Sequence, residues 1–111
     1  MSLPENWDGI FYSKESYGDM LFDLSPEEFL KQPGVQQQGP QFLFAAAIFD
    51  LLWNNEEELA VRWHEFAKSQ WPDASWDLIE GMVKIGKEYL EQGAPRSYLT
   101  SMIYMFLEMA F

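Results

Sequence analysis

The stretch Pro40–Trp53 reads PQFLFAAAIFDLLW, and eleven of its last twelve residues are apolar, with Asp50 as the exception. A helix of this composition is apolar on nearly every side, so it needs neighbours all round rather than along one stripe. Pro40 suits the first position of a helix, and the two asparagines that follow the stretch mark its end. The sequence therefore predicts a central helix over 40–53 that the remaining segments surround.

Start and stop signals along the rest of the chain predict further helices. Ser25, Pro26 and Glu28 form a capping-box start, and Gly93 suits the position after a helix end. Together with the hydrophobic periodicity, these signals predict helices at about 26–32, 55–70, 75–92 and 95–110. Strand signals are nearly absent, because the chain has three valines and few threonines. We predict an all-α, single-domain bundle of four main helices plus the short one at 26–32.

Two segments lack a clear helical pattern. Residues 34–39 are rich in glutamine and are interpreted as a polar connector. Residues 1–24 scatter aromatic side chains among glycines and acids, and we expect an irregular arm that these aromatics pin to the helical body.

Several packing expectations follow from the apolar patterns. We expect the two most apolar segments, 40–53 and 96–111, to lie together at the centre, with 55–70 and 76–92 as amphipathic covers. Gly86 lies on the apolar stripe of its helix, where close packing against another helix would justify a glycine. One unbroken helix through Asn54 and Asn55 is an alternative to two separate helices.

Asp50 is the lone acid in the most apolar segment. The favoured expectation is that it lies on a solvent-facing edge. If it is buried, it needs a partner such as Arg62, Arg96, a tyrosine hydroxyl or a backbone donor.

The composition limits the classes of function. The chain of 111 residues has 18 acids against 7 bases, a formal net charge of −11, and 17% aromatic residues. Direct nucleic-acid binding needs a basic surface and is not expected, whereas a basic protein would be attracted. No targeting signal is apparent, and the apolar run is too short for a bilayer, which takes about 20 residues. We expect a cytoplasmic protein without membrane association.

Catalytic and metal-binding patterns are weak. His64 is the single histidine; Lys68 and Val61 stand where a second zinc ligand or a di-iron glutamate would be needed. The chain has no cysteine. We therefore expect neither an enzyme nor a bound cofactor or metal, and a carboxylate-based enzyme or a small-molecule binder remains a less favoured hypothesis.

The candidate partner-binding residues are acids and aromatics near the N-terminus, since aromatic anchors rimmed by charge are typical of protein interfaces. They are Trp7, Asp8, Tyr12, Glu15, Tyr17, Asp19, Asp23, Glu27 and Glu28. The alternative is that these aromatics belong to the core and the acids merely lie outside it.

The last helix is apolar on more than one side, which suggests a covering partner chain. Its candidate oligomer-interface residues are Tyr98, Tyr104, Met105 and Phe111. The main functional hypothesis is a small acidic inhibitor or immunity-type protein that blocks a basic partner protein, as nucleic-acid mimics do. The alternative is a structural or assembly subunit that forms homo-oligomers through its C-terminal helix.

Overall fold

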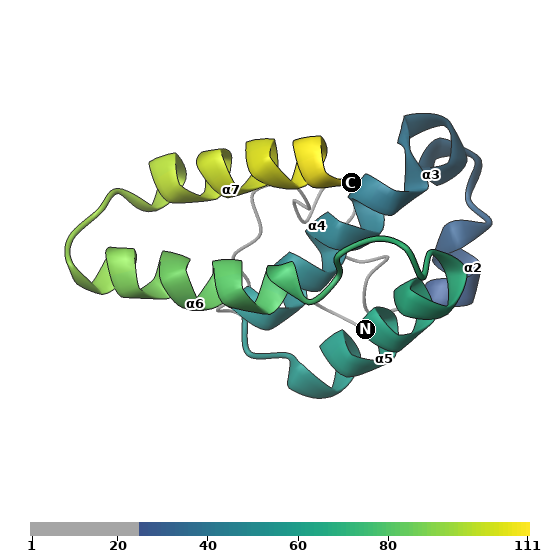
Figure 1. The fold of residues 1–111 in the computed structure, drawn as a ribbon, viewed down its shortest axis with the longest axis horizontal. Coiled ribbons are helices and arrows are strands. Elements are labelled where there is room, and N and C mark those ends of the chain that lie inside the picture. Colours follow the sequence, from purple (N-terminus) through teal and green to yellow (C-terminus); the bar gives the residue numbers. More distant parts are fainter. Residues whose placement is uncertain (1–24) are drawn as a thin grey trace.

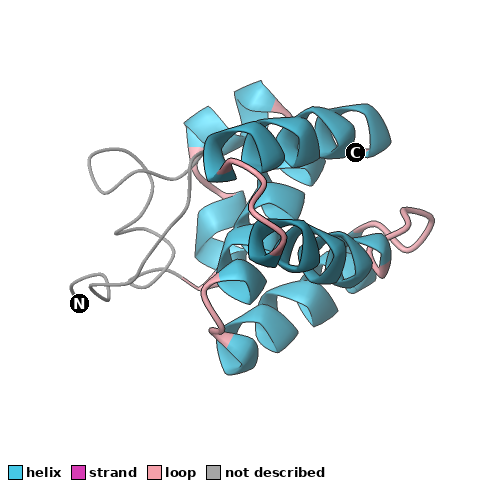
Figure 2. Cartoon of the chain, turned by 90° about the vertical axis from the view of Figure 1, so that its left-hand side faces the viewer, coloured by secondary structure: helices cyan, strands magenta, loops and turns pink. Residues whose placement is uncertain are grey.

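Helix α4 (Pro40–Trp53) lies among all the other main helices in the computed structural model, which describes residues 25–111 apart from the side chains of Arg96, Ser97 and Thr100 (Figure 1). The other elements are α2 (Pro26–Leu30), α3 (Pro33–Gln38), α5 (Glu57–Gln70), α6 (Leu78–Glu91) and α7 (Arg96–Ala110). The described part of the chain contains helices and loops and no strand, which confirms the predicted all-α fold (Figure 2). The predicted N-terminal arm, 1–24, lies outside the described residues.

Helix α4 is buried around its whole circumference. Every residue from Leu43 to Leu51 is fully inaccessible to solvent, and α4 contacts α3, α5, α6 and α7. The predicted boundaries, 40–53, are those of the helix. Within the described residues, no helix combines the length and apolarity needed to cross a bilayer.

The first two helices are set by local signals. The Ser25 hydroxyl accepts a hydrogen bond from the Glu28 backbone N–H at 3.1 Å, so the predicted cap at the start of α2 is confirmed. The predicted connector over 34–39 is wrong, because residues Pro33–Gln38 form helix α3. Pro33 starts this helix at its first position, and Val35, only 1% exposed, anchors it against the core. The sequence pattern did not predict this helix, because Val35 is its one buried residue and the exposed glutamines around it show no apolar periodicity.

A tight turn separates α4 from α5. Asn55 adopts φ +61°, a left-handed conformation that asparagine tolerates, and the Glu56 N–H donates to the Leu51 carbonyl at 2.8 Å. This geometry excludes the unbroken helix. Helix α5 therefore begins at Glu57, later than the predicted start at 55.

Aromatic rings from distant parts of the sequence form a continuous row through the core. Phe29 of α2 contacts Phe44 of α4, with ring centroids 5.5 Å apart, and Phe44 also contacts Trp63 of α5 at 5.3 Å. The row continues through Trp71 and Trp76 of the α5–α6 loop to Phe111, whose ring centroid lies 4.6 Å from that of Trp76. These contacts join α2, α4, α5 and the C-terminus into one core.

The predicted pairing of 40–53 with 96–111 at the centre is wrong. Helix α7 lies at the edge of the molecule, packed on α4 and α6 through buried Leu99, Ile103 and Leu107, while α4 alone is enclosed (Figure 1). Helix α5 takes a large share of the surface of α4 by burying Trp63 and small alanines against it. Helix α7 is thus one of the covers, and a cover needs to bury only one side.

Gly86 of α6 confirms the predicted close packing. A Cβ atom at this position would lie 2.9 Å from Cζ3 of Trp53 and 3.0 Å from Cδ1 of Ile103. At Gly81 of the same helix, a Cβ atom would meet nothing within 4 Å. Two glycines in one helix thus face opposite constraints.

We expect Gly86→Ala to destabilise the protein by about 1–3 kcal/mol, because the added methyl group must displace the Trp53 ring. Gly81→Ala is the matched control and should stabilise it by about 0.5–1 kcal/mol, because alanine is the better helix former. Urea unfolding followed by circular dichroism measures both changes. Equal stabilisation by the two substitutions would contradict the close contact.

Candidate binding face on helices α6 and α7

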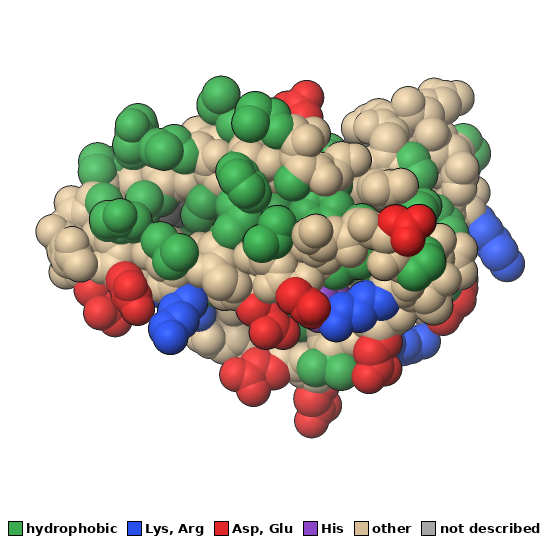
Figure 3. All heavy atoms as spheres, in the orientation of Figure 1, with side chains coloured by type: hydrophobic (Ala, Val, Ile, Leu, Met, Phe, Trp, Pro, Cys, Tyr) green, Lys and Arg blue, Asp and Glu red, His purple; other side chains and the backbone are tan. Residues whose placement is uncertain are grey.

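Large apolar side chains that remain exposed gather over α6 and α7 (Figure 3). We call this set the apolar face; its members, each between 44% and 81% exposed, are Leu78, Ile85, Tyr89, Tyr98, Met102, Met105, Phe106 and Met109. Elsewhere in residues 25–111, Val61 of α5 is the one other large hydrophobic side chain exposed to this degree. The exposed apolar surface is therefore concentrated on one helical hairpin.

A groove of about 370 Å³ runs between α6 and α7 on this face. Its walls are exposed members of the apolar face, Ile85 and Tyr89 on α6 and Met102 and Phe106 on α7, with half-buried Met82 beside them. Its other lining residues are the buried Gly86, Leu99 and Ile103, which form the floor. The Tyr89 hydroxyl is the only polar side-chain group among the residues that line it.

Helical spacing explains why this surface is left uncovered. Ile79, Val83 and Gly86 of α6, together with Leu99, Ile103 and Leu107 of α7, recur every three or four residues and are buried. Ile85 and Tyr89 lie beside the buried stripe of α6, and Met102 and Phe106 lie beside that of α7. Each helix therefore has an apolar arc wider than the surface that α4 can cover.

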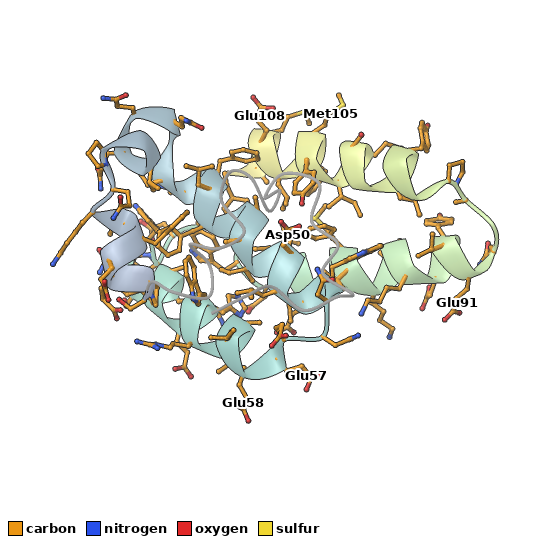
Figure 4. All side chains as sticks on the ribbon, turned by 180° about the vertical axis from the view of Figure 1, so that it is seen from behind. Asp50, Glu57, Glu58, Glu91, Met105 and Glu108 are labelled. Carbon is orange, nitrogen blue, oxygen red and sulfur yellow. The ribbon has the colours of Figure 1, made fainter. Side chains whose placement is uncertain are left out.

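Acidic residues border the apolar face. Glu88 follows Ile85 by three residues and Glu108 follows Met105 by three, so each acid neighbours a member of the face on the helix surface. Met105 and Glu108 point away from the body of the molecule on α7, and Glu91 does so on α6 (Figure 4). Lys84, one turn before Glu88, is the basic residue on this side of α6. Three acids against one lysine leave the borders net negative.

A buried hydrogen bond fixes the rotation of α7. Asp50 is fully buried, and its Oδ1 accepts a hydrogen bond from the Tyr104 hydroxyl of α7. The expectation that Asp50 lies on a solvent-facing edge is wrong, because α4 has no such edge; a tyrosine hydroxyl is one of the partners anticipated for a buried Asp50. With Tyr104 held inward, residues Met102, Met105 and Met109 are directed outward.

The predicted oligomer-interface residues divide into two pairs. Tyr98 and Met105 are 61% and 65% exposed and belong to the apolar face. Tyr104 and Phe111 do not: Tyr104 is 9% exposed, and Phe111 is half-buried against Trp76. Their assignment to an exposed face is wrong, because Asp50 and the aromatic row draw these two rings inward.

The predicted partner-binding residues lie mainly outside the described part of the chain. Trp7, Asp8, Tyr12, Glu15, Tyr17, Asp19 and Asp23 belong to residues 1–24. Glu27 and Glu28 are exposed on α2, which packs against α3 and α5 rather than α6 and α7. Glu27 lies 4.0 Å from Arg62 of α5, and Glu28 caps its own helix. Neither borders the apolar face.

The sequence prediction missed the contribution of α6 to the face. The segment 76–92 was expected to be an amphipathic cover, but exposed Leu78 and Tyr89, together with the buried residues of α6, span too wide an arc to be enclosed by a single neighbour. The width of that arc was the available signal. Which part of it stays exposed depends on the position of α7.

His64 belongs to a charged cluster that joins α5 to the start of α6. Its Nε2 lies 3.8 Å from Asp77 and its Nδ1 lies 3.9 Å from Glu80. Lys68 contacts Asp77 at 2.8 Å, and its hydrogen bond and positive charge lower the pKa of that carboxyl below its usual value. Within residues 25–111, no three histidine or carboxylate side chains are grouped so as to hold a metal ion. We interpret the cluster as a contact between helices.

Comparisons with known proteins identify no relative of this chain. No protein-family model matches the chain, and no curated protein or solved structure is significantly similar to it. Any proposal for its function therefore stands on the apolar face, the acidic borders and the composition.

We expect Tyr104→Phe to destabilise the protein by about 1.5–3 kcal/mol, because it removes a hydrogen bond to a buried carboxyl group. Tyr98→Phe is the matched control, since this hydroxyl is on an exposed side chain of the same helix, and it should change the free energy of unfolding by less than about 0.5 kcal/mol. Urea unfolding measures both. Equal effects of the two substitutions would show that the Asp50 contact does not stabilise the fold.

Proposed function

We propose that this chain is a small acidic protein-binding module, an inhibitor or immunity-type protein that blocks a basic partner protein. The observation that carries the proposal is the apolar face with its acidic borders, presented by a chain with a net charge of −11. Outside the apolar face, Val61 is the one large hydrophobic side chain of the described residues that is exposed to a similar degree.

The size of the apolar face supports binding to another protein. Eight large side chains, each about half exposed, present on the order of 800 Å², which approaches the area that one partner buries in a standard interface. Contiguous exposed apolar patches larger than a few hundred Å² are uncommon on monomeric proteins and mark interaction sites. An apolar centre surrounded by polar residues is also the usual anatomy of such a site.

The charge supports a basic partner. A surface with excess negative charge attracts a positively charged protein over distances of about 10 Å at 0.1 M salt and speeds the encounter. It also disfavours acidic partners by like-charge repulsion. Proteins that handle nucleic acids carry basic surfaces for the phosphate backbone, so they are the partner class that best fits this charge.

Homo-oligomerisation is the second candidate, because the outer side of α7 exposes Tyr98, Met105 and Met109. A two-fold symmetric dimer would bury the same face on both copies. It would also bring together two chains that each carry a net charge of −11. We rank it second for this electrostatic cost.

The test is affinity capture with the immobilised chain at about 0.1 M and about 1 M salt, where the Debye length falls from about 10 Å to about 3 Å. We expect an identified partner with a basic surface that is retained at low salt and released at high salt. Adding the chain should also reduce that partner's own activity or nucleic-acid binding.

Matched charge variants localise the effect. Glu88→Gln with Glu108→Gln should weaken the capture by several-fold, whereas Glu57→Gln with Glu58→Gln, on the exposed start of α5, should change it little (Figure 4). A captured partner that is acidic, or retention independent of salt, would contradict the proposal. A stable dimer in light scattering with no captured partner would favour the second candidate.

A further inference from the structure

We infer that the groove between α6 and α7 receives one amphipathic helix of the partner protein, with apolar residues on its inner side and lysine or arginine residues on its flanks. This inference rests on the proposed function and names the part of the partner that is bound. Four properties of the groove support it: its length, the absence of hydrogen-bonding walls, the charge of its borders and the flexible residues along it.

The groove is long enough for about two helical turns. Its lining runs from Met82 to Tyr89 on α6 and from Leu99 to Phe106 on α7, eight residues of each helix. At 1.5 Å per residue this is about 12 Å. Exposed Leu78 and Met109 extend the apolar surface along the same two helices, so a partner helix of about four turns has apolar contacts along its length. Helices bound in apolar grooves are anchored by side chains at positions i, i+3 or i+4, and i+7. A groove of about 370 Å³ can receive more than one such anchor.

The groove favours a helix over an extended segment. Its lining residues offer one side-chain hydroxyl, that of Tyr89, and the backbone groups of α6 and α7 are engaged within their own helices. An extended segment would lie there with its backbone N–H and C=O groups unsatisfied, which is costly in an apolar site. A helix satisfies these groups internally and presents only side chains.

The borders favour positively charged flanks. Glu88 and Glu91 on α6 outnumber Lys84, so a helix in the groove meets net negative charge along its α6 side. Glu108 lies on the other side of α7, beside Tyr104 and Met105, and adds to the negative charge of the chain without touching the groove. A second copy of this chain is a poorer occupant. A two-fold axis would place identical acid-bordered faces against each other.

Methionines give the groove adaptable walls. Met82 and Met102 line it, and Met105 and Met109 lie further out on α7. Unbranched thioether side chains repack around differently shaped apolar groups. The groove therefore selects for an amphipathic pattern more than for one particular side chain.

The test uses a fluorescein-labelled helical peptide of about four turns, with leucines at i, i+4, i+7 and i+11 and lysines beside them. Fluorescence anisotropy measures its binding to the full chain. A second peptide has every lysine replaced by glutamate, and a third has the same composition as the first in scrambled order. We expect the lysine peptide to bind at least about tenfold more tightly than either of the other two.

Substitutions at exposed β-branched residues localise the binding. Ile85→Lys should weaken binding of the lysine peptide by about tenfold, because it places a charge in the wall of the groove. Val61→Lys on α5 is the matched control, since Val61 is 55% exposed and Ile85 is 53% exposed, and it should leave the affinity unchanged. Circular dichroism of both variants verifies that the helical fold is retained.

Three outcomes would overturn the inference. Equal binding of the lysine and glutamate peptides would show that the acidic border does not contribute to the affinity. Equal effects of Ile85→Lys and Val61→Lys would show that the peptide does not bind in the groove. A dimer that Ile85→Lys converts to a monomer would identify a second copy as the occupant. If the groove fails but an identified basic partner is still captured in a salt-dependent way, the proposed function stands and its binding site lies elsewhere.

Discussion

Helix α4 is apolar on all sides, and this property constrains every other helix in the described part of the molecule. A helix with a polar side can rest at a surface, but Pro40–Trp53 has none, and its one acid, Asp50, is buried with the rest. The chain meets this requirement by placing α3, α5, α6 and α7 around it. Asp50 does not need a solvent-facing side of α4, because the Tyr104 hydroxyl of α7 donates a hydrogen bond to it inside the core. A polar residue thereby specifies which side of α7 faces inward.

The candidate binding face is a consequence of this arrangement. Helix α7 covers α4 with one side, set by Tyr104 and by the buried Leu99, Ile103 and Leu107, and its other apolar residues have no neighbour in the described chain. Helix α6 is drawn close to α4 and α7 at Gly86, where an added Cβ would meet Trp53 and Ile103. The same close approach lets Gly86 form part of the groove floor. Core packing and the exposed groove thus depend on the same contacts.

The local signals of the sequence predicted the helices well and their mutual positions less well. Caps and breakers act within a few residues, so the bounds of α4, the cap at Ser25 and the break at Gly93 followed from sequence alone. Helix α3 was missed because one buried valine, Val35, anchors it among exposed glutamines. The burial of Asp50 and of Tyr104 could not be predicted from either helix separately, since each depends on the other across 54 residues. For the same reason, the sequence pattern identified only Tyr98 and Met105 of the apolar face. Predicting which residues of α6 stay exposed requires knowing where α7 packs.

We infer that the described helices leave one apolar groove, bordered by acids on α6, for a helix of a basic partner. Nuclear magnetic resonance of the chain with labelled methionine, isoleucine and valine methyl groups tests it most directly, with the lysine-flanked amphipathic peptide as the probe. We expect the methyl signals of Met82, Ile85 and Met102, which line the groove, to shift on titration, while those of exposed Val61 and buried Ile48 stay unchanged. Shifts at Val61 without shifts at these three residues would contradict it.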